Sequence, residues 1–327
     1  MNSSKQKFSK DIIKLKNIAE TCNTIVERLR KEVLEGFRRR GGVIGISGGI
    51  DSSVALALSI KAFGPEKVLG VMLPEKDSSH ESEMLAKELA EKFGVKTQTE
   101  DITQALEGFN CYTRRDEAVK RIFPEYSPEN YKMKIGIKQN PGNQNLPPIF
   151  SLVIVDLKGN EFSKILPINE YLQIVASSNF KQRCRMSMLY YHAERLHYAV
   201  IGTPNKHEVD QGFFVKYGDG GADIMPIGKL YKSQVYELAK YLGIPESIIQ
   251  RTPTTDTYTA VQTQEEFFYQ MPFHLMDLIW YGYENSYSAE EVAIALTMEP
   301  DEIRKIYMNF MRKHQTTAYL RMSPVHF

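Results

Sequence analysis

One short stretch restricts the possible folds of this chain more than any other: GGVIGISGGIDSSVALALS, residues 41–59. An apolar run, 43–46, is followed by a Ser-Gly-Gly turn, an Asp-Ser-Ser cluster and an Ala/Leu-rich segment. This order is typical of a buried β-strand, a tight loop and an α-helix. The stretch therefore predicts a strand–loop–helix unit.

The loop of this unit has the features of an anion site. Backbone N–H groups at a helix start are unpaired, and the helix dipole adds partial positive charge there. Gly48 and Gly49 let phosphate oxygens approach closely, and hydroxyl donors come from Ser47, Ser52 and Ser53. Asp51 fits beside an anion when a cation such as nucleotide-borne Mg²⁺ lies between them. The alternative is an ordinary turn capped by Asp-Ser-Ser.

Two well-known phosphate loops are excluded, because no lysine follows the glycines and no G-x-G-x-x-G is present. Elsewhere strands alternate with helices. We predict strands at 67–74, 95–102 and 198–203, and helices at 18–37, 82–94, 179–197 and 232–243. Such alternation favours an α/β fold with a doubly wound parallel sheet and helices on both faces.

This rhythm breaks at about 110–166, which we interpret as an insertion. Residues 124–148 are rich in Pro, Asn and Gly and favour loop, whereas 149–166 predicts two strands around a Lys-Gly-Asn turn. The result would be a hairpin or small flap, either a passive surface elaboration or an active-site lid. A helical C-terminal segment is expected at about 265–327.

Charge and cysteine content narrow the class of protein. The 41 basic and 40 acidic residues balance, which argues against a nucleic-acid partner. Three cysteines without a CxxC pair favour neither a disulfide framework nor a zinc site. No apolar run is long enough for a membrane span, and the first 20 residues lack a signal-peptide core. We expect a cytoplasmic protein with no membrane partner.

The motifs also carry a family resemblance. SGGIDS (47–52) resembles the pyrophosphate loop of the N-type ATP pyrophosphatases, which cleave ATP between the α- and β-phosphates. The stretches 198–235 and 179–186 (NFKQRCRM) resemble the ammonia-dependent NAD synthetase family, and the match extends over roughly 15–109 and 179–255. The resemblance implies one adenine nucleotide alpha-hydrolase-like domain over 1–327. Its reaction would adenylate nicotinic acid adenine dinucleotide (deamido-NAD) and amidate it with ammonia, giving NAD, AMP and pyrophosphate.

The resemblance also implies roles for individual residues. Asp51 and Glu208 would be Mg²⁺ ligands, and Asp51, Lys232 and Thr254 would be catalytic. The ATP site would comprise Ser47, Gly48, Gly49, Ile50, Asp51, Ser52, Ser53, Met72, Thr203, Lys216, Lys232 and Thr254. The deamido-NAD site would comprise Asn179, Arg183, Asp219 and Asp223. Taken singly, several of these residues also fit a plain structural role. Glu208 could be a first-turn helix residue, and Lys232 could lie at a solvated helix start. Arg183 could form an ion pair on a helix surface, and Asp219 could stabilise a turn.

Several departures from the family pattern lie on the acceptor side. They are the long insertion, Pro204, the aromatic run Phe267–Phe268–Tyr269, and KHQTTAYLRMSP in place of a basic C-terminal tail. A divergent member that amidates another carboxylate, such as a sugar acid or a biosynthetic intermediate, therefore stays open. So does a non-catalytic nucleotide-binding regulator.

The nitrogen source and the assembly are further expectations. Fewer than 45 residues precede the loop, too few for a glutaminase domain, so we expect free ammonia or ammonia from a separate glutaminase. The resemblance implies a homodimer.

Overall fold

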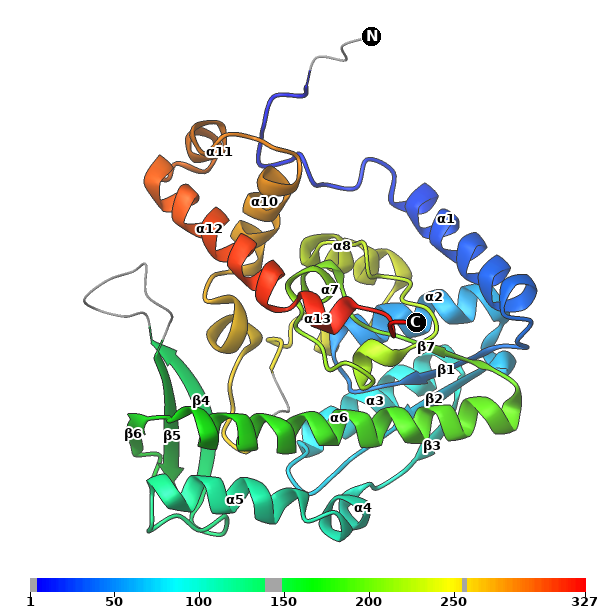
Figure 1. The fold of residues 1–327 in the computed structure, drawn as a ribbon. Helices are drawn as coiled ribbons and strands as arrows, with labels where there is room; N and C mark the ends of the chain where they lie inside the picture. Colours follow the sequence, from blue (N-terminus) through cyan, green and yellow to red (C-terminus); the bar gives the residue numbers. More distant parts are fainter. Residues whose placement is uncertain (1–4, 139–148, 255–257) are drawn as a thin grey trace.

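The computed structural model describes residues 5–138, 149–254 and 258–327. Its main sheet is parallel and has the strand order β3-β2-β1-β7 (Figure 1). The strands are β1 (Gly42–Gly45), β2 (Val68–Met72), β3 (Lys96–Thr99) and β7 (Ala199–Ile201). Gly42 is in register with both Val68 and Ala199. The strand order reverses at β1, so the loop after β1 lies at the switch point, where α/β sheets bind ligands.

Apolar side chains point alternately to the two faces of the sheet along each strand, and both faces are therefore covered by helices. Ile44 and Ile46 belong to the core shared with α1, α2, α3 and α8, whereas Val43 and Val71 pack with residues of α6 on the other face. The bounds are α1 Ile18–Lys31, α2 Ile50–Phe63, α3 His80–Phe93, α6 Ile168–Leu196 and α8 Lys232–Leu242. The predicted doubly wound sheet with helices on both faces is confirmed.

Shorter helices complete the sheet region. They are α4 Thr103–Gly108, α5 Cys111–Ile122, α7 Lys206–Gln211 and α9 Glu246–Ile249, with π-helical turns at Glu32–Gly36 and Glu265–Tyr269 and 3₁₀ turns at Pro65–Lys67 and Asp219–Gly221. One boundary differs clearly from its prediction: α6 begins at Ile168, not near 179. Its additional turns pack against α5, an element that the sequence did not predict.

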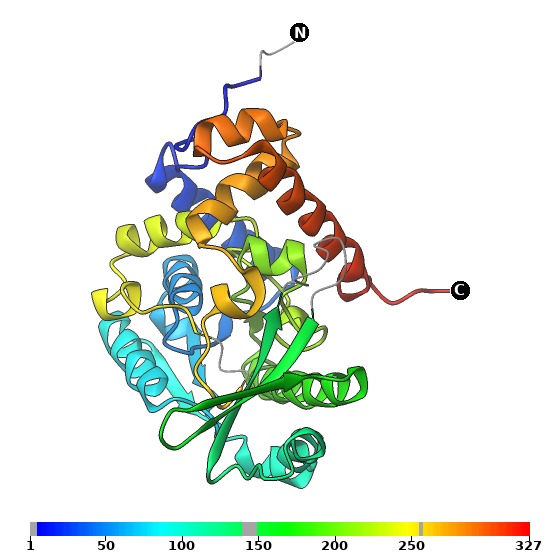
Figure 2. The same ribbon diagram turned by 90° about the vertical axis from the view of Figure 1, so that its left-hand side faces the viewer.

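The insertion forms a second, antiparallel sheet with the order β4-β5-β6 (Figure 2). The strands are β4 (Tyr131–Lys138), β5 (Ile149–Asp156) and β6 (Glu161–Ile165). The two predicted strands are β5 and β6, but the prediction of loop throughout 124–148 was wrong at β4. The Pro and Asn residues of the segment 124–148 lie before and after β4 in the sequence. Within β4 itself apolar and polar residues alternate, and Met133 and Ile135 are buried.

The predicted helical C-terminal segment is also present. It contains α10 Phe273–Glu284, α11 Ala289–Leu296, α12 Pro300–Thr316 and α13 Ala318–Arg321. These helices share an apolar core that includes Tyr269, Met276 and Trp280, and they contact α7 and α8. Side chains of Phe267 and Phe268 lie outside the described residues. Within the part of the chain that the structure describes, no helix is both long and apolar enough to cross a membrane.

Candidate active site

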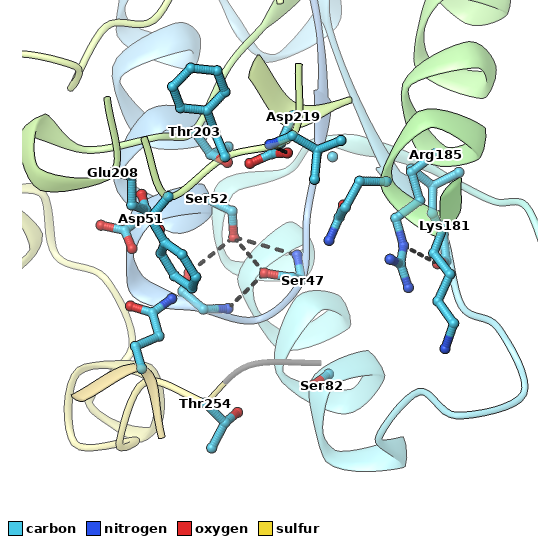
Figure 3. A pocket seen from close by; sticks show the side chains of 18 of the residues that line it. Ser47, Asp51, Ser52, Ser82, Lys181, Arg185, Thr203, Glu208, Asp219 and Thr254 are labelled. Atoms are coloured by element: carbon cyan, nitrogen blue, oxygen red, sulfur yellow. Dashed lines mark hydrogen bonds between the residues drawn. The ribbon is translucent and has the colours of Figure 1, made fainter. Parts of the chain in front are cut away.

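A cavity of about 640 Å³ opens beside the carboxyl ends of the main-sheet strands. The parts of the chain that line it include the loop after β1, the residues that follow β2, the starts of α3 and α8, one side of α6, the segments after β7 and α9, and the C-terminal segment. These parts are far apart in the sequence, and the sheet topology brings them together (Figure 3).

The loop after β1 keeps its shape through glycine and two serines. Gly48 has a φ of 69°, and a Cβ atom there would lie 2.6 Å from the Ser82 carbonyl oxygen of α3. Only glycine therefore allows both the turn and the close packing of α3. The Ser47 hydroxyl accepts a hydrogen bond from the Gly49 amide at 3.3 Å, and the Ser52 hydroxyl donates to the Gly49 carbonyl at 3.0 Å.

Most of the predicted loop residues reach the cavity, and two do not. Ser47, Gly49, Ile50, Asp51 and Ser52 line it. Gly48 does not line the cavity and instead packs on α3. Ser53 is fully buried, and its hydroxyl donates to the Gly49 carbonyl at 2.8 Å. For these two residues the structure shows a role in loop shape.

Asp51, Glu208 and Lys232 meet at one side of the cavity, and we call them the loop cluster. The ammonium of Lys232, which is 1% exposed, donates to the Asp51 carboxylate. Glu208 stands beside Asp51 (Figure 3). It is also the third residue of α7, where its carboxylate accepts from the Asn205 amide at 2.9 Å in a capping box. Glu208 therefore has the structural role of a first-turn helix residue and also lines the cavity.

The loop cluster contains one more carboxylate than cations. Burial, and then the neighbouring Asp51, raise the pKa of Glu208 to about 8. Burial of Lys232 opposes its charged form, but Asp51 and Glu208 outweigh this and raise the pKa of the lysine. When both carboxylates are ionised, the loop cluster carries one negative charge more than Lys232 balances, and an additional cation would offset it.

The donor set of the loop cluster fits Mg²⁺ that arrives with a nucleotide. Mg²⁺ takes one or two protein carboxylates and completes its octahedron with water and phosphate oxygens. Asp51 and Glu208 supply two carboxylates next to a loop shaped for phosphate. Nowhere in 5–138, 149–254 or 258–327 do three His, Cys, Asp or Glu side chains gather into a self-sufficient metal site.

The residues predicted for the deamido-NAD site fall into two groups, those that line the cavity and one that does not. Asn179, Arg183 and Asp219 line the cavity, whereas Asp223 does not. Burial raises the pKa of Asp219 to about 6, and its carboxylate accepts from the Val215 amide at 2.9 Å. Asp223 braces the fold: it accepts from the Tyr190 hydroxyl at 2.8 Å and from the amide of Val200 in β7 at 2.8 Å.

Four more predicted residues of the nucleotide site line the cavity: Met72, Thr203, Lys216 and Thr254. Lys216 has partners in the C-terminal segment, because its ammonium donates to the carbonyls of Tyr319 at 3.1 Å and Met322 at 2.7 Å. Thr317 and Leu320 of the same segment also reach the cavity. The C-terminal tail thus forms part of the wall.

A second group of buried charges includes one cavity residue, Lys181, and we call it the wall cluster: Glu75, Asp77, Arg115 and Lys181. The Lys181 ammonium donates to Glu75 at 2.9 Å and to Asp77 at 2.6 Å, and Arg115 donates to Asp77 at 2.5 Å. All four side chains are at most 8% exposed. Although burial opposes the shift, Arg115 and Lys181 lower the pKa of Asp77.

The sequence prediction missed Lys181 and Arg185 as cavity residues (Figure 3). A signal was available, since the two basic residues stand four apart in NFKQRCRM and therefore share one helix face. It also missed Arg251, whose guanidinium donates to the Ser82 hydroxyl at 2.9 Å, for which the local sequence offers no signal.

Comparisons with known proteins agree with this geometry. A family model described as NAD synthase matches residues 20–136 and 154–321. The unmatched residues 137–153 lie within the predicted insertion. An NH3-dependent NAD+ synthetase of Mesorhizobium japonicum is 46% identical over 301 residues, which are 92% of this chain and 94% of that protein. One from Rhizobium meliloti is 46% identical over 317 residues, 97% of this chain and 94% of that protein.

Solved structures with this fold include an NMN synthetase from Francisella tularensis, with a TM-score of 0.63 and 24% identity over 95% of this chain and 98% of that one. An NH3-dependent NAD synthetase from Campylobacter jejuni gives a TM-score of 0.62 and 21% identity, covering 96% of this chain and 100% of that chain. At these identities the structures show the fold alone.

Proposed function

The chain belongs to the NAD synthase family, and on this premise we propose that it is an ammonia-dependent NAD synthetase. In this reaction a carboxylate oxygen of deamido-NAD attacks the α-phosphorus of ATP, and the bond to the β-phosphate oxygen breaks to release pyrophosphate. Ammonia then attacks the acyl carbon of the adenylate. AMP leaves, the nitrogen loses a proton, and the amide of NAD remains.

The observation that carries this proposal is the loop cluster beside the phosphate-type loop. Ser47, Ser52 and the amides at the start of α2 would hold the departing pyrophosphate. Lys232 would stabilise its developing charge, at a buried position where a cation acts more strongly than in water. Asp51 and Glu208 would hold Mg²⁺, which supplies Lewis-acid polarisation of the phosphate oxygens.

The remaining cavity residues would orient the two substrates. Thr254 would contact the phosphates, and Asn179, Arg183 and Asp219 would position the dinucleotide so that its carboxylate faces the α-phosphorus. Asp223 would act indirectly, by holding β7 and Tyr190 in place. The protein's part in the chemistry is then mainly positioning and electrostatic stabilisation.

The nitrogen donor, assembly and location are part of the same proposal. Free ammonia suits a chain whose curated relatives are described as NH3-dependent, and a separate glutaminase could deliver it. Burial raises the pKa of Cys22, Cys111 and Cys184, which disfavours the thiolate that a glutaminase nucleophile requires.

Exposed apolar side chains on α6, among them Leu172 and Tyr191, suit a homodimer of a cytoplasmic protein.

A reconstituted reaction tests the proposal. Purified protein is mixed with ATP, Mg²⁺, ammonium chloride and deamido-NAD, and the products are separated by chromatography. We expect NAD, AMP and pyrophosphate in equal amounts, and none when EDTA replaces Mg²⁺. If the folded protein binds Mg-ATP but forms no NAD, the acceptor assignment is wrong, and other carboxylates are then screened for AMP release.

A further inference from the structure

The insertion sheet is linked to the cavity through the outer edge of β4. Strand β4 pairs with β5 on one side only, and its other edge faces residues 259–262. The Met133 amide donates to the Thr259 hydroxyl at 2.7 Å, and the Ala260 amide donates to the Met133 carbonyl at 3.0 Å. The Gln262 side-chain amide donates to the Ile135 carbonyl at 3.1 Å. An edge that would otherwise present unpaired backbone groups is thus occupied by a loop segment.

The same segment is joined directly to a residue of the proposed nucleotide site. Thr263 forms an antiparallel bridge with Thr254, and the Gln264 amide donates to the Pro253 carbonyl at 3.1 Å. Thr254 and Gln264 both line the cavity. The residue bonded to β4, Gln262, is therefore followed directly by the residue that is paired with Thr254. In Figure 2 the residues just before the turn at Glu265–Tyr269 lie beside the strands of the insertion sheet.

We propose that β4, through Thr259 and Gln262, positions Thr254 in the nucleotide site. This rests on the proposed function, in which Thr254 contacts the phosphates of ATP. Ordering a loop residue opposes binding by its lost backbone entropy. A segment held in place before the nucleotide arrives avoids that loss at the binding step, so the tether raises affinity for ATP. Thr259 and Gln262 are positioning residues, because neither is among the residues that line the cavity.

Two substitutions test the tether. Gln262→Met keeps the volume of this buried side chain but removes its hydrogen bond to Ile135, and Thr259→Val removes the acceptor for the Met133 amide. We expect each to raise the KM for Mg-ATP about fivefold, the effect of one hydrogen bond, with little change in kcat at saturation. Thr259→Ser keeps the hydroxyl and restores the wild-type KM. The control on the same strand is Lys134→Gln, which removes only the exposed ion pair with Glu161.

A double-mutant cycle separates positioning from a general loss of structure. If Gln262 acts through Thr254, Gln262→Met raises the KM in the wild type but not in a Thr254→Ala background. Amide hydrogen exchange of 259–263 should accelerate in Gln262→Met and not in Lys134→Gln. Full additivity of the two substitutions, or faster exchange with an unchanged KM, would overturn the inference.

Direct nucleotide binding keeps this test independent of the reaction. The Kd of Mg-ATP, measured by calorimetry without an acceptor, should rise about fivefold in Gln262→Met. Should the wild type form no NAD, the proposed function fails, whereas an unchanged Kd in Gln262→Met would overturn the inference even if NAD is formed.

Discussion

The loop cluster and the wall cluster, two groups of buried charges, differ in their balance of positive and negative charge. In the loop cluster, Asp51 and Glu208 share the single cation Lys232, and the pKa of Glu208 is raised to about 8. In the wall cluster, Lys181 and Arg115 between them pair with both Glu75 and Asp77, and the pKa of Asp77 is lowered. Tyr112 completes the second group by donating to Glu75 at 2.6 Å.

Such a difference is expected between a cluster that binds a ligand and a cluster that stabilises the fold. Paired and hydrogen-bonded charges offset the free energy that their burial requires, and they keep one arrangement of the chain. A group with surplus negative charge gains its missing partner from a ligand. Burial of charge is common to both clusters, and the imbalance of charge is what singles out the loop cluster as the proposed nucleotide site.

The largest effect is expected from removing the only cation of the loop cluster. Lys232→Met should lower kcat/KM about 100- to 1000-fold, because it removes charge stabilisation of the leaving pyrophosphate. Rapid-quench measurement of AMP release checks this, with circular dichroism to confirm folding. Lys229→Met, an exposed lysine three residues away, is the matched control and should be close to wild type. Similar losses in both variants would contradict the role of Lys232.

A smaller effect on activity is expected when a carboxylate of the loop cluster is converted to an amide, and this change separates activity from stability. Asp51→Asn should lower activity about 100-fold by weakening the hold on Mg²⁺. Its free energy of unfolding should stay within about 1 kcal/mol of wild type, because Glu208 remains to balance the charge of Lys232 and the repulsion between the two carboxylates is relieved. Mg²⁺ titration of the activity and urea denaturation measure the two quantities.

The corresponding change in the wall cluster should act on stability. Glu75→Gln removes a fully buried charge that pairs with Lys181, so we expect the free energy of unfolding to fall by about 3 kcal/mol. Activity of the folded protein should fall far less than in Asp51→Asn. Urea denaturation of both variants under the same conditions makes the comparison. If Asp51→Asn loses more stability than Glu75→Gln, the proposed difference in role between the two clusters is wrong.

The smallest effect concerns the proton on Glu208. A carboxyl with a raised pKa in the folded state stabilises the fold fully at low pH, and this contribution is lost as the pH rises through that pKa. The protein without nucleotide should therefore lose stability between about pH 5 and pH 8, measured by thermal denaturation. Glu208→Gln, which cannot ionise, should lack this component.

Ligand binding offers a second measurement of the same proton. Because Mg²⁺ requires the ionised carboxylate, binding of Mg-ATP at pH 7 should release up to about one proton per site and almost none at pH 9. Calorimetry in buffers of different ionisation enthalpy measures this release. Equal release at both pH values would assign the proton to another group.

The main sheet and its phosphate loop could be predicted because their signals are local. The apolar run 43–46, the turn at Gly48 and the helix after Gly49 follow from backbone preferences within a few residues. Strand β4 was missed because the Pro- and Asn-rich segments on both sides outweigh eight alternating residues. The early start of α6 was missed because contacts with α5 help to stabilise its first turns.

The sequence alone therefore determined the α/β class and the strand–loop–helix unit, and its resemblance to a family singled out Asp51, Glu208 and Lys232. Only the tertiary structure decided which charges are paired and which are in surplus. It alone placed Gly48, Ser53 and Asp223 outside the cavity lining, and it alone joined β4 to Thr254. The physical reason is distance along the chain: Asp51 and Lys232 are 181 residues apart, and no local preference encodes that contact.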